Sequence, residues 1–301
     1  MSQPLDPAAA VRYGEFVIDA YAMYQGNQSS LTPAPIVPAG WALVAWIQMS
    51  DFVLFNSTPK FYGYIARNAN SPDQHLIVIR GTVGWVEWID DCSILKVPFA
   101  QAPGAGRVAY GFDKIYSTMN VVPKTSTLAK TLAVSPSQTL TGSFGEQVDQ
   151  LVAARPRSAA LPPDAVEPPP SLVVTGHSLG AALCTLYVME HAAKKQAGAP
   201  TICTFASPRV GDSVFVAAFN ALALTSWRIV NVQDLVPGLP PPLLGYAHVD
   251  CETAKDSNGL VQWTPTCWHV METYLALLDG SLKPGSDCAL SAQDLASVRS
   301  Q

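Results

Sequence analysis

Two hydrophobic periods alternate along the second half of the chain. Short β-branched and aromatic runs follow period two or are continuously apolar, and between them apolar residues recur every three to four positions. We therefore expect strands at 171–175, 201–206 and 227–232, and helices at 181–196 and 213–222. Strands and helices in this order predict an α/β fold with a mainly parallel central sheet and helices on both of its faces.

The first half follows the same two periods with less alternation. Its apolar positions predict an amphipathic opening helix, four strands and two further helices, in the order 11–24, 41–48, 61–67, 76–80, 94–99, 110–119 and 144–154. Because this half has too little strand–helix alternation to close a core of its own, we expect residues 1–301 to form a single domain. The proline-rich segment 155–170 is then a surface insertion rather than a linker, and the tail 283–301, poor in large hydrophobic residues, is peripheral.

Composition narrows the class of protein. The 301 residues are 49% hydrophobic and 14% charged with a net charge of -5, which is typical of a globular chain and offers no surface for nucleic acid. The uncharged stretch 25–50 is broken by prolines and leaves only 41–49 continuously apolar, too short for a transmembrane span. No secretory signal is visible at the N-terminus, so a cytoplasmic location is the default expectation, with secretion by another route left open. The sequence gives no indication of the oligomeric state.

The six cysteines show no metal-ligand spacing, and we expect neither a metal nor a cofactor. Cys184 and Cys203 lie in apolar segments and read as small buried residues. Cys251 and Cys267 could form a disulfide in an oxidising compartment, but the default expectation is six free thiols.

A Gly-x-Ser-x-Gly pentapeptide, GHSLG at 176–180, follows the strand at 171–175 and precedes small helix-forming residues. This strand–turn–helix context predicts a nucleophile elbow with Ser178 at its apex. A turn this tight strains the serine backbone and needs residues without a Cβ at Gly176 and Gly180. In such an elbow the backbone N–H of Leu179, the residue after the nucleophile, is one donor of the oxyanion hole.

A serine hydroxyl needs a histidine to accept its proton, and the five histidines can be sorted by reach. The side chain of His177 diverges from its neighbour, His191 lies about 20 Å along the helix, and His75 sits at the wrong end of its strand. Of the remaining two, His269 starts a late amphipathic helix after the strand-like run 259–263, where a final loop would return a base to the serine. We favour His269 and expect His248 to pack or hydrogen-bond locally.

The third member of the expected triad is a carboxylate between serine and histidine in the chain order of α/β-hydrolases. Asp234 leaves the strand at 227–232 and enters a proline-stiffened loop at the carboxyl edge of the sheet. Asp212 is better explained as the N-cap of the next helix. Asp250 and Asp256 remain weaker alternatives.

Several blocks of sequence, in this order, resemble the class 3 lipase family of α/β-hydrolases. They are RGT at 80–82, EWIDD at 87–91, TGHSLGAAL at 175–183, FASPRVGD at 205–212, RIVNVQDLVPGLPP at 228–241, GYAHV at 245–249 and WHVMETYL at 268–275. RYGEF at 12–16 and GFDKIYSTM at 111–119 are similar to the plant phospholipase A1-like branch. The resemblance implies an α/β-hydrolase fold with Ser178, Asp234 and His269 as nucleophile, orienting acid and base.

The resemblance also implies roles for the segment after the strand at 76–80. Thr82 corresponds to the second oxyanion-hole residue, through its backbone N–H and its hydroxyl. The following stretch corresponds to the family's lid, with the acyl-facing residues Trp85, Val86, Trp88 and Ile89. A fixed amphipathic helix packed on the core is the alternative for this stretch.

These expectations converge on a serine carboxylic ester hydrolase that works through an acyl-enzyme, with a triacylglycerol lipase or esterase as the favoured form. Its partners would be an acylglycerol or another lipid ester and, through the lid, a lipid interface. The alternative is a phospholipase A1 or galactolipase, which would place positive side chains near the acyl cleft. A non-catalytic lipid-binding protein is the remaining alternative, and an intact triad argues against it.

Overall fold

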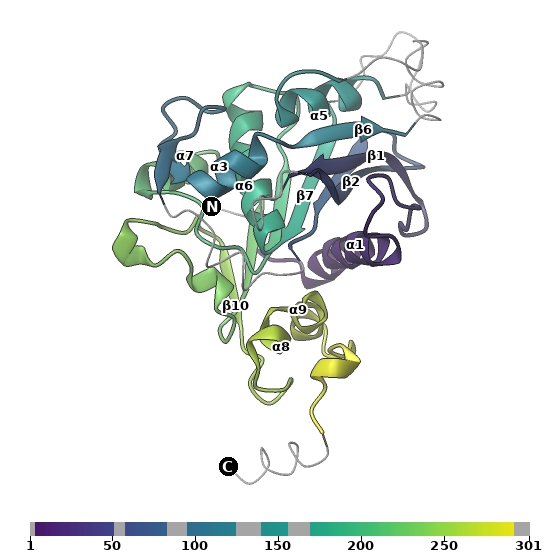
Figure 1. The fold of residues 1–301 in the computed structure, drawn as a ribbon, viewed down its shortest axis with the longest axis vertical. Coiled ribbons are helices and arrows are strands. Elements are labelled where there is room, and N and C mark those ends of the chain that lie inside the picture. Colours follow the sequence, from purple (N-terminus) through teal and green to yellow (C-terminus); the bar gives the residue numbers. More distant parts are fainter. Residues whose placement is uncertain (1–3, 51–57, 83–94, 125–139, 156–168, 292–301) are drawn as a thin grey trace.

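Eight strands form one mixed sheet in the order β10-β9-β8-β7-β3-β2-β1-β6 (Figure 1). The computed structural model describes residues 4–50, 58–82, 95–124, 140–155 and 169–291. The strands β10, β9, β8, β7 and β3 pair in parallel, and β2, β1 and β6 continue the sheet in antiparallel pairs. Their bounds are β1 Trp41–Met49, β2 Lys60–Asn68, β3 Gln74–Ile79, β6 Asn120–Pro123, β7 Ser171–His177, β8 Thr201–Phe205, β9 Ser226–Asn231 and β10 Glu252–Lys255.

The pairing of β3 with β7 joins strands from the two halves of the chain. Residues 74–79 run beside residues 171–176 in parallel register. Parallel strands end at the same edge of a sheet, so the carboxyl ends of β3, β7, β8 and β9 bring residues that are far apart in sequence to one edge. A separate two-stranded sheet joins β4 (Lys96–Pro98) and β5 (Arg107–Ala109).

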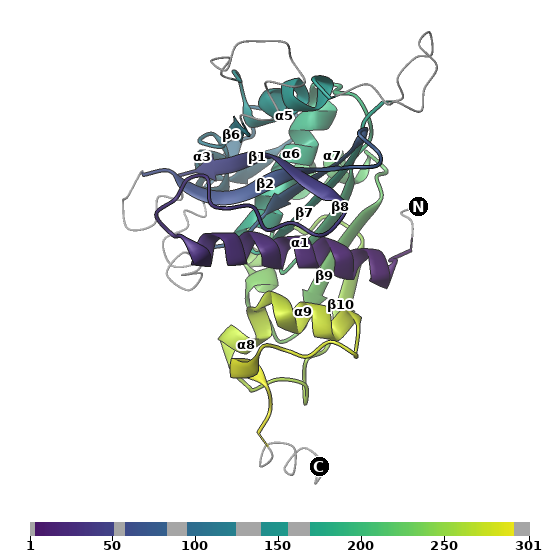
Figure 2. The same ribbon diagram turned by 90° about the vertical axis from the view of Figure 1, so that its right-hand side faces the viewer.

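Helices cover both faces of the sheet (Figure 2). The opening helix α1 (Pro7–Gly26) lies on one face with α9 (Met271–Leu278) beside it. The other face carries α3 (Tyr110–Tyr116), α5 (Phe144–Ala153), α6 (Leu179–Ala193) and α7 (Ser213–Asn220). None of the described helices is long and apolar enough to cross a membrane.

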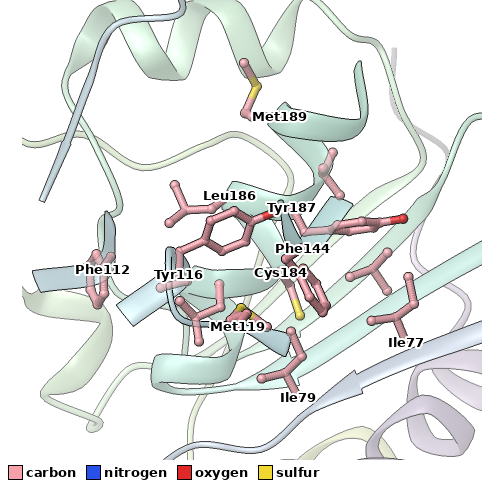
Figure 3. Close-up of a cluster of buried hydrophobic side chains, with 14 of the residues drawn as sticks. Ile77, Ile79, Phe112, Tyr116, Met119, Phe144, Cys184, Leu186, Tyr187 and Met189 are labelled. Atoms are coloured by element: carbon pink, nitrogen blue, oxygen red, sulfur yellow. The ribbon is translucent and has the colours of Figure 1, made fainter. Parts of the chain in front are cut away.

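The helix α6 is buried along its whole first half and beyond, from Leu179 to His191. Aromatic side chains pack edge to face around it, with ring centroids of Tyr116 and Phe144 5.9 Å apart and of Phe144 and Tyr187 5.5 Å apart. Figure 3 shows this cluster over Ile77 and Ile79 of β3. Close packing on every side leaves α6 little freedom to move, so its N-terminal residue is held firmly against the sheet.

The expected helices and strands are found, except for the strand-like run 259–263, with boundaries shifted by a few residues, and three short strands add to them. β5, β6 and β10 were not expected from the sequence, because each has only three or four residues. The strand-like run 259–263 forms no strand; Val261 makes only an isolated bridge with Ala289. Nearly all of the proline-rich segment 155–170 lies outside the described residues.

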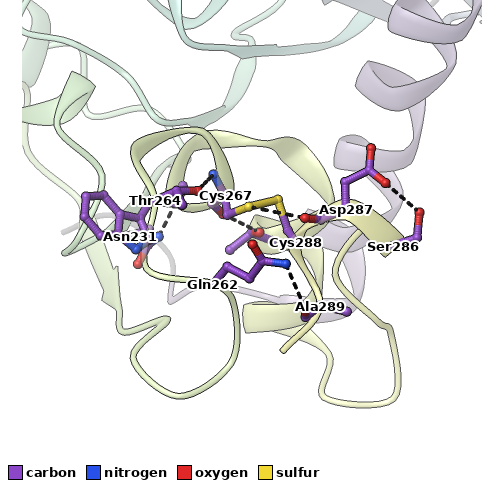
Figure 4. The surroundings of a disulfide bond; sticks show 10 residues. Asn231, Gln262, Thr264, Cys267, Ser286, Asp287, Cys288 and Ala289 are labelled. Atoms are coloured by element: carbon purple, nitrogen blue, oxygen red, sulfur yellow. Dashed lines mark hydrogen bonds between the residues drawn. A yellow bond between two sulfur atoms is a disulfide. The ribbon is translucent and has the colours of Figure 1, made fainter. Parts of the chain in front are cut away.

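A disulfide joins Cys267 and Cys288 across a separation of 21 residues (Figure 4). The expectation of free thiols is therefore wrong for these two residues, and the suggested pairing of Cys251 with Cys267 is wrong as well, since Cys251 is a free thiol. Cys184 and Cys203 are free and buried, as expected. The sequence could not choose the pair because chain separation says nothing about which thiols the fold brings together. Part of the expected peripheral tail is thus tied to the body of the protein.

Candidate active site

Ser178 lies at the apex of a sharp turn between β7 and α6. Its backbone adopts φ 57° and ψ −125°, a conformation that residues with a Cβ rarely take. A Cβ on Gly176 would lie 2.8 Å from the backbone of Gly180, and a Cβ on Gly180 would collide with the carbonyl oxygen of Ile79. Both glycines are therefore required by close approach, and the turn has the geometry of the expected nucleophile elbow.

The structure brings the three expected triad residues together. The Ser178 Oγ and His269 Nε2 atoms are 2.9 Å apart, and His269 Nδ1 lies 2.7 Å from Asp234 Oδ2. All three side chains are buried. One expectation needs correction, because His269 ends the short helix α8 (Pro265–His269) instead of starting a helix, and α9 begins two residues later.

The carboxylate of Asp234 is held by two further donors. The backbone N–H of Val236 donates to Oδ1 at 3.0 Å, and the Tyr274 hydroxyl donates to Oδ2 at 2.7 Å. Burial, and then the negative charge of Asp234, raise the pKa of Tyr274 well above its ordinary value, so the phenol keeps its proton. These contacts leave Asp234 one preferred orientation, with Oδ2 facing the His269 ring.

A second set of hydrogen bonds connects His177 to both sides of the site. Because the carbonyl oxygen of His269 can only accept, Nε2 of His177 carries the proton that it donates there, at 2.7 Å. Its Nδ1 then accepts from the Tyr21 hydroxyl at 2.8 Å, and that hydroxyl accepts from the backbone N–H of Gly81 at 2.8 Å. Burial and the adjacent His269 hold the pKa of His177 well below its ordinary value, in agreement with a neutral ring.

The expected oxyanion-hole residues border the Ser178 side chain. Leu179 is the first residue of α6, where a backbone N–H has no partner within the helix. Thr82 is 8% exposed, and its hydroxyl has no hydrogen-bond partner in the described part of the chain. A Cβ on Gly81 would lie 2.9 Å from the Ser178 Cβ, so the segment 80–82 packs directly on the serine. The Leu179 N–H and Thr82 can therefore serve as donors to an oxyanion on a carbon atom bonded to the Ser178 Oγ.

Arg80 organises the backbone of this segment. Its guanidinium lies between the rings of Tyr24 and Tyr62, 3.7 and 4.1 Å from their centroids, and donates to the carbonyl oxygens of Phe61 and Gly81. The helix α1 thus supplies two tyrosines, Tyr21 and Tyr24, to the segment that carries Thr82.

The remaining candidates lie elsewhere. The imidazoles of His75, His191 and His248 bond to the backbone carbonyls of Asp73, Gly198 and Pro237, and Asp212 caps α7 through the Phe215 N–H, as expected. Asp250 and Asp256 do not bond to His269 in the described structure; Asp256 accepts from Gln233.

The expected lid residues Trp85, Val86, Trp88 and Ile89 lie outside the described residues. No three His, Cys, Asp or Glu side chains within the described ranges gather as a metal site would require.

Residues 76–244, more than half of the chain, match the family model described as Lipase (class 3). The chain belongs to the class 3 lipase family. The match spans the elbow and Asp234, so both lie within the sequence that defines the class 3 lipases.

Curated relatives include plant phospholipases. The chain is 29% identical to Phospholipase A1-II 4 of Oryza sativa subsp. japonica, over 75% of this chain and 57% of the relative. It is 34% identical to Phospholipase A1-II 7 of Oryza sativa subsp. indica, over 58% of this chain and 42% of the relative. The chain thus spans about half the length of the curated relatives it matches.

Solved lipase structures share the fold. The Lip2 lipase of Yarrowia lipolytica aligns with a TM-score of 0.57 at 19% identity, over 85% of this chain and 82% of that one. The Rhizomucor miehei lipase propeptide complex aligns with a TM-score of 0.55 at 20% identity, over 82% and 68%. With the parallel strands and the helices on both faces, these likenesses confirm the predicted α/β-hydrolase fold.

Three residues of this class 3 lipase site were missed in the sequence. Tyr21 is one of the apolar positions that predict the opening helix, the side chain of His177 is expected to diverge from the serine, and nothing in the sequence singles out Tyr274. Each reaches the site only through a tertiary contact, and a tyrosine at helical spacing looks the same whether its hydroxyl is used or not. Only the position of His177 inside the pentapeptide carried a local signal.

Proposed function

We propose that this chain is a serine carboxylic ester hydrolase that acts on lipid esters. The observation that carries the proposal is the continuous line of hydrogen-bonding atoms from the Ser178 Oγ through His269 to Asp234. The buried Thr82 hydroxyl, which has no described partner and follows the Gly81 that packs on the serine, supports the proposal, because such a group gains a partner when an oxyanion forms.

In the proposed reaction the Ser178 Oγ attacks the ester carbonyl carbon while Nε2 of His269 takes its proton. Asp234 stabilises the imidazolium, and the Leu179 N–H with Thr82 stabilises the oxyanion. The imidazolium then protonates the leaving alcohol, which departs and leaves an acyl-enzyme. Water attacks this ester with His269 as base, and the carboxylic acid and free Ser178 are released.

The favoured substrate is a triacylglycerol, and a phospholipid is the second candidate. The second is supported by the relatives named phospholipase A1. A galactolipid is grouped with the phospholipid, because hydrolysis of the same acyl ester bond would release a fatty acid from either polar lipid. A lipid-binding protein without activity is disfavoured, since binding gains nothing from a strained serine in contact with a base.

Hydrolysis of p-nitrophenyl acyl esters tests the proposal. Ser178→Ala should lower kcat/KM by at least about a thousandfold, while Ser117→Ala, an exposed serine after α3, should have the wild-type rate. Equal rates for the wild type and Ser178→Ala would remove this serine from the reaction.

Fatty acid release from triacylglycerol emulsions, phospholipid vesicles and galactolipid dispersions then separates the substrates. Activity on triacylglycerol alone supports the favoured form, and release from the sn-1 position of phospholipid supports the second.

A further inference from the structure

The loop directly after Asp234 presents hydrophobic side chains to solvent. Residues 235–245, here called the proline loop, read LVPGLPPPLLG and contain no charged residue. Leu243 is 96% exposed, Leu235 53% and Leu244 42%. Leucines exposed to this extent on one loop are unusual for a soluble surface unless the surface binds something.

Hydrogen bonds from neighbouring side chains and backbone hold the backbone of the proline loop in place. Arg209 donates from its backbone N–H to the Leu239 carbonyl at 2.7 Å and from its guanidinium to the carbonyls of Gly238 and Pro240. His248 donates to the Pro237 carbonyl at 2.7 Å. Because its backbone is held in this way, the loop loses little backbone freedom when its leucines are buried against a partner.

A fourth exposed leucine, Leu95, lies on the neighbouring segment. The Lys96 Nζ donates to the carbonyls of Leu244 and Gly245 at 2.9 Å each, which fastens β4 to the proline loop. Leu95, the residue before Lys96, is 64% exposed. The apolar surface therefore extends from Leu243 and Leu244 across to Leu95.

Cations border this apolar surface. Lys96 and Arg209 contact the proline loop as described, and Arg107 donates to the Lys96 carbonyl at 2.6 Å. In the described part of the chain, none of these three cations forms an ion pair with a carboxylate. Exposed leucines beside cations without a carboxylate partner match the two regions of an anionic membrane surface. The leucines suit the acyl chains inside, and the cations suit the negative headgroups at the surface.

We propose that the proline loop docks this protein on a phospholipid bilayer that carries anionic headgroups. Leu243 and Leu244 enter the acyl boundary, Leu95 lies at its edge, and Lys96, Arg107 and Arg209 face the headgroups. The inference rests on the proposed function, because a loop that starts beside Asp234 would bring the Ser178 site to the lipid esters. It does not depend on the expected lid.

Sedimentation with vesicles tests the docking. The wild type and Leu243→Ser/Leu244→Ser are mixed with phosphatidylcholine vesicles with and without 30% phosphatidylglycerol, an amount on the order of that in anionic membranes. We expect the double variant to bind anionic vesicles at least about tenfold more weakly. Ile36→Ser is the matched control: Ile36 is 42% exposed, as is Leu244, but it lines a pocket with Glu15 and Ile18 of α1 and with no residue of the proline loop, so its replacement should leave binding unchanged.

A soluble p-nitrophenyl ester, measured in parallel, separates this proposal from the proposed function. The double variant should hydrolyse it at the wild-type rate, since the leucines point to solvent. Absence of ester turnover with intact vesicle binding would refute the hydrolase and leave the docking surface. Three outcomes would overturn the docking proposal. The double variant could bind vesicles as tightly as the wild type, or the wild type could bind neutral and anionic vesicles equally. The wild type could also bind no vesicles and form a dimer that becomes monomeric in the double variant.

Discussion

The carbonyl oxygen of His269 accepts a hydrogen bond from His177, the residue directly before Ser178. Ser178 thus contacts the imidazole of His269, and its neighbour His177 holds the backbone that carries this imidazole. Asn231 holds the preceding carbonyl, that of Trp268, at 2.8 Å. Two consecutive carbonyls are therefore held by side chains from β7 and β9, which limits the positions open to the His269 ring.

Tyr21→Phe tests the link between α1 and the site. The variant removes the donor to His177 and leaves the Gly81 N–H without its acceptor, so we expect kcat to fall about tenfold, the loss of about one net hydrogen bond, with little change in KM. Steady-state kinetics on a soluble ester measure both constants. Tyr13→Phe, on the same helix and stacked on Trp227, is the control. An unchanged kcat in Tyr21→Phe would show that the hydroxyl does not position catalytic groups.

Thr82→Val tests the unpartnered hydroxyl. A valine fills the same volume without a buried polar atom, so the free energy of unfolding should stay equal or rise, while kcat falls about a hundredfold through the lost oxyanion donor. Thr82→Ser, which keeps the hydroxyl, should retain most of the activity. Urea unfolding and ester kinetics on the same samples check this, and wild-type activity in Thr82→Val would limit the role of Thr82 to its backbone N–H.

Cys288→Ser tests the disulfide. Opening a 21-residue loop should lower the free energy of unfolding by about 3 kcal/mol, and the loss should be matched by adding reductant to the wild type. Because Cys267 lies two residues before His269 in α8, we also expect ester hydrolysis to be lost at a lower temperature. Cys251→Ser, which removes a free thiol, should unfold like the wild type. Equal unfolding midpoints with and without reductant would contradict the prediction.

His75→Gln tests a pH dependence of stability. Burial lowers the pKa of His75 to about 4 in the folded protein, below its value of about 6.5 in an unfolded chain. The unfolded chain therefore binds the proton first, so stability present above pH 6.5 is lost as the pH falls toward 4, by up to about 3 kcal/mol. His248 acts in the same direction, and Asp19, whose pKa is raised to about 6 by burial and Glu15, acts in the opposite one.

The measurement for His75 is therefore a difference between two proteins. Glutamine cannot take up the proton, so the free energy of unfolding of His75→Gln should fall less than that of the wild type between pH 6.5 and 4. Parallel curves for the two proteins would show that His75 is not the titrating group.

Local sequence determined the elements and the elbow of this protein. The spacing of apolar residues placed the long strands and helices, and the pentapeptide in its strand–turn–helix context predicted the conformation found at Ser178. The chain order of Asp234 and His269 agreed with their meeting at one edge of the sheet. These features depend on a few neighbouring residues, or on the rule that parallel strands end at the same edge.

Tertiary structure alone decided which side chains complete the site. Tyr21 and Tyr274 lie on helices at opposite ends of the chain, and only the packing of α1 and α9 against the sheet brings their hydroxyls to His177 and Asp234. The pairing of Cys267 with Cys288 was decided in the same way. Hydrogen bonds and disulfides act over a few ångströms in space, and a distance of that kind between remote residues is not recorded in the order of a chain until it folds.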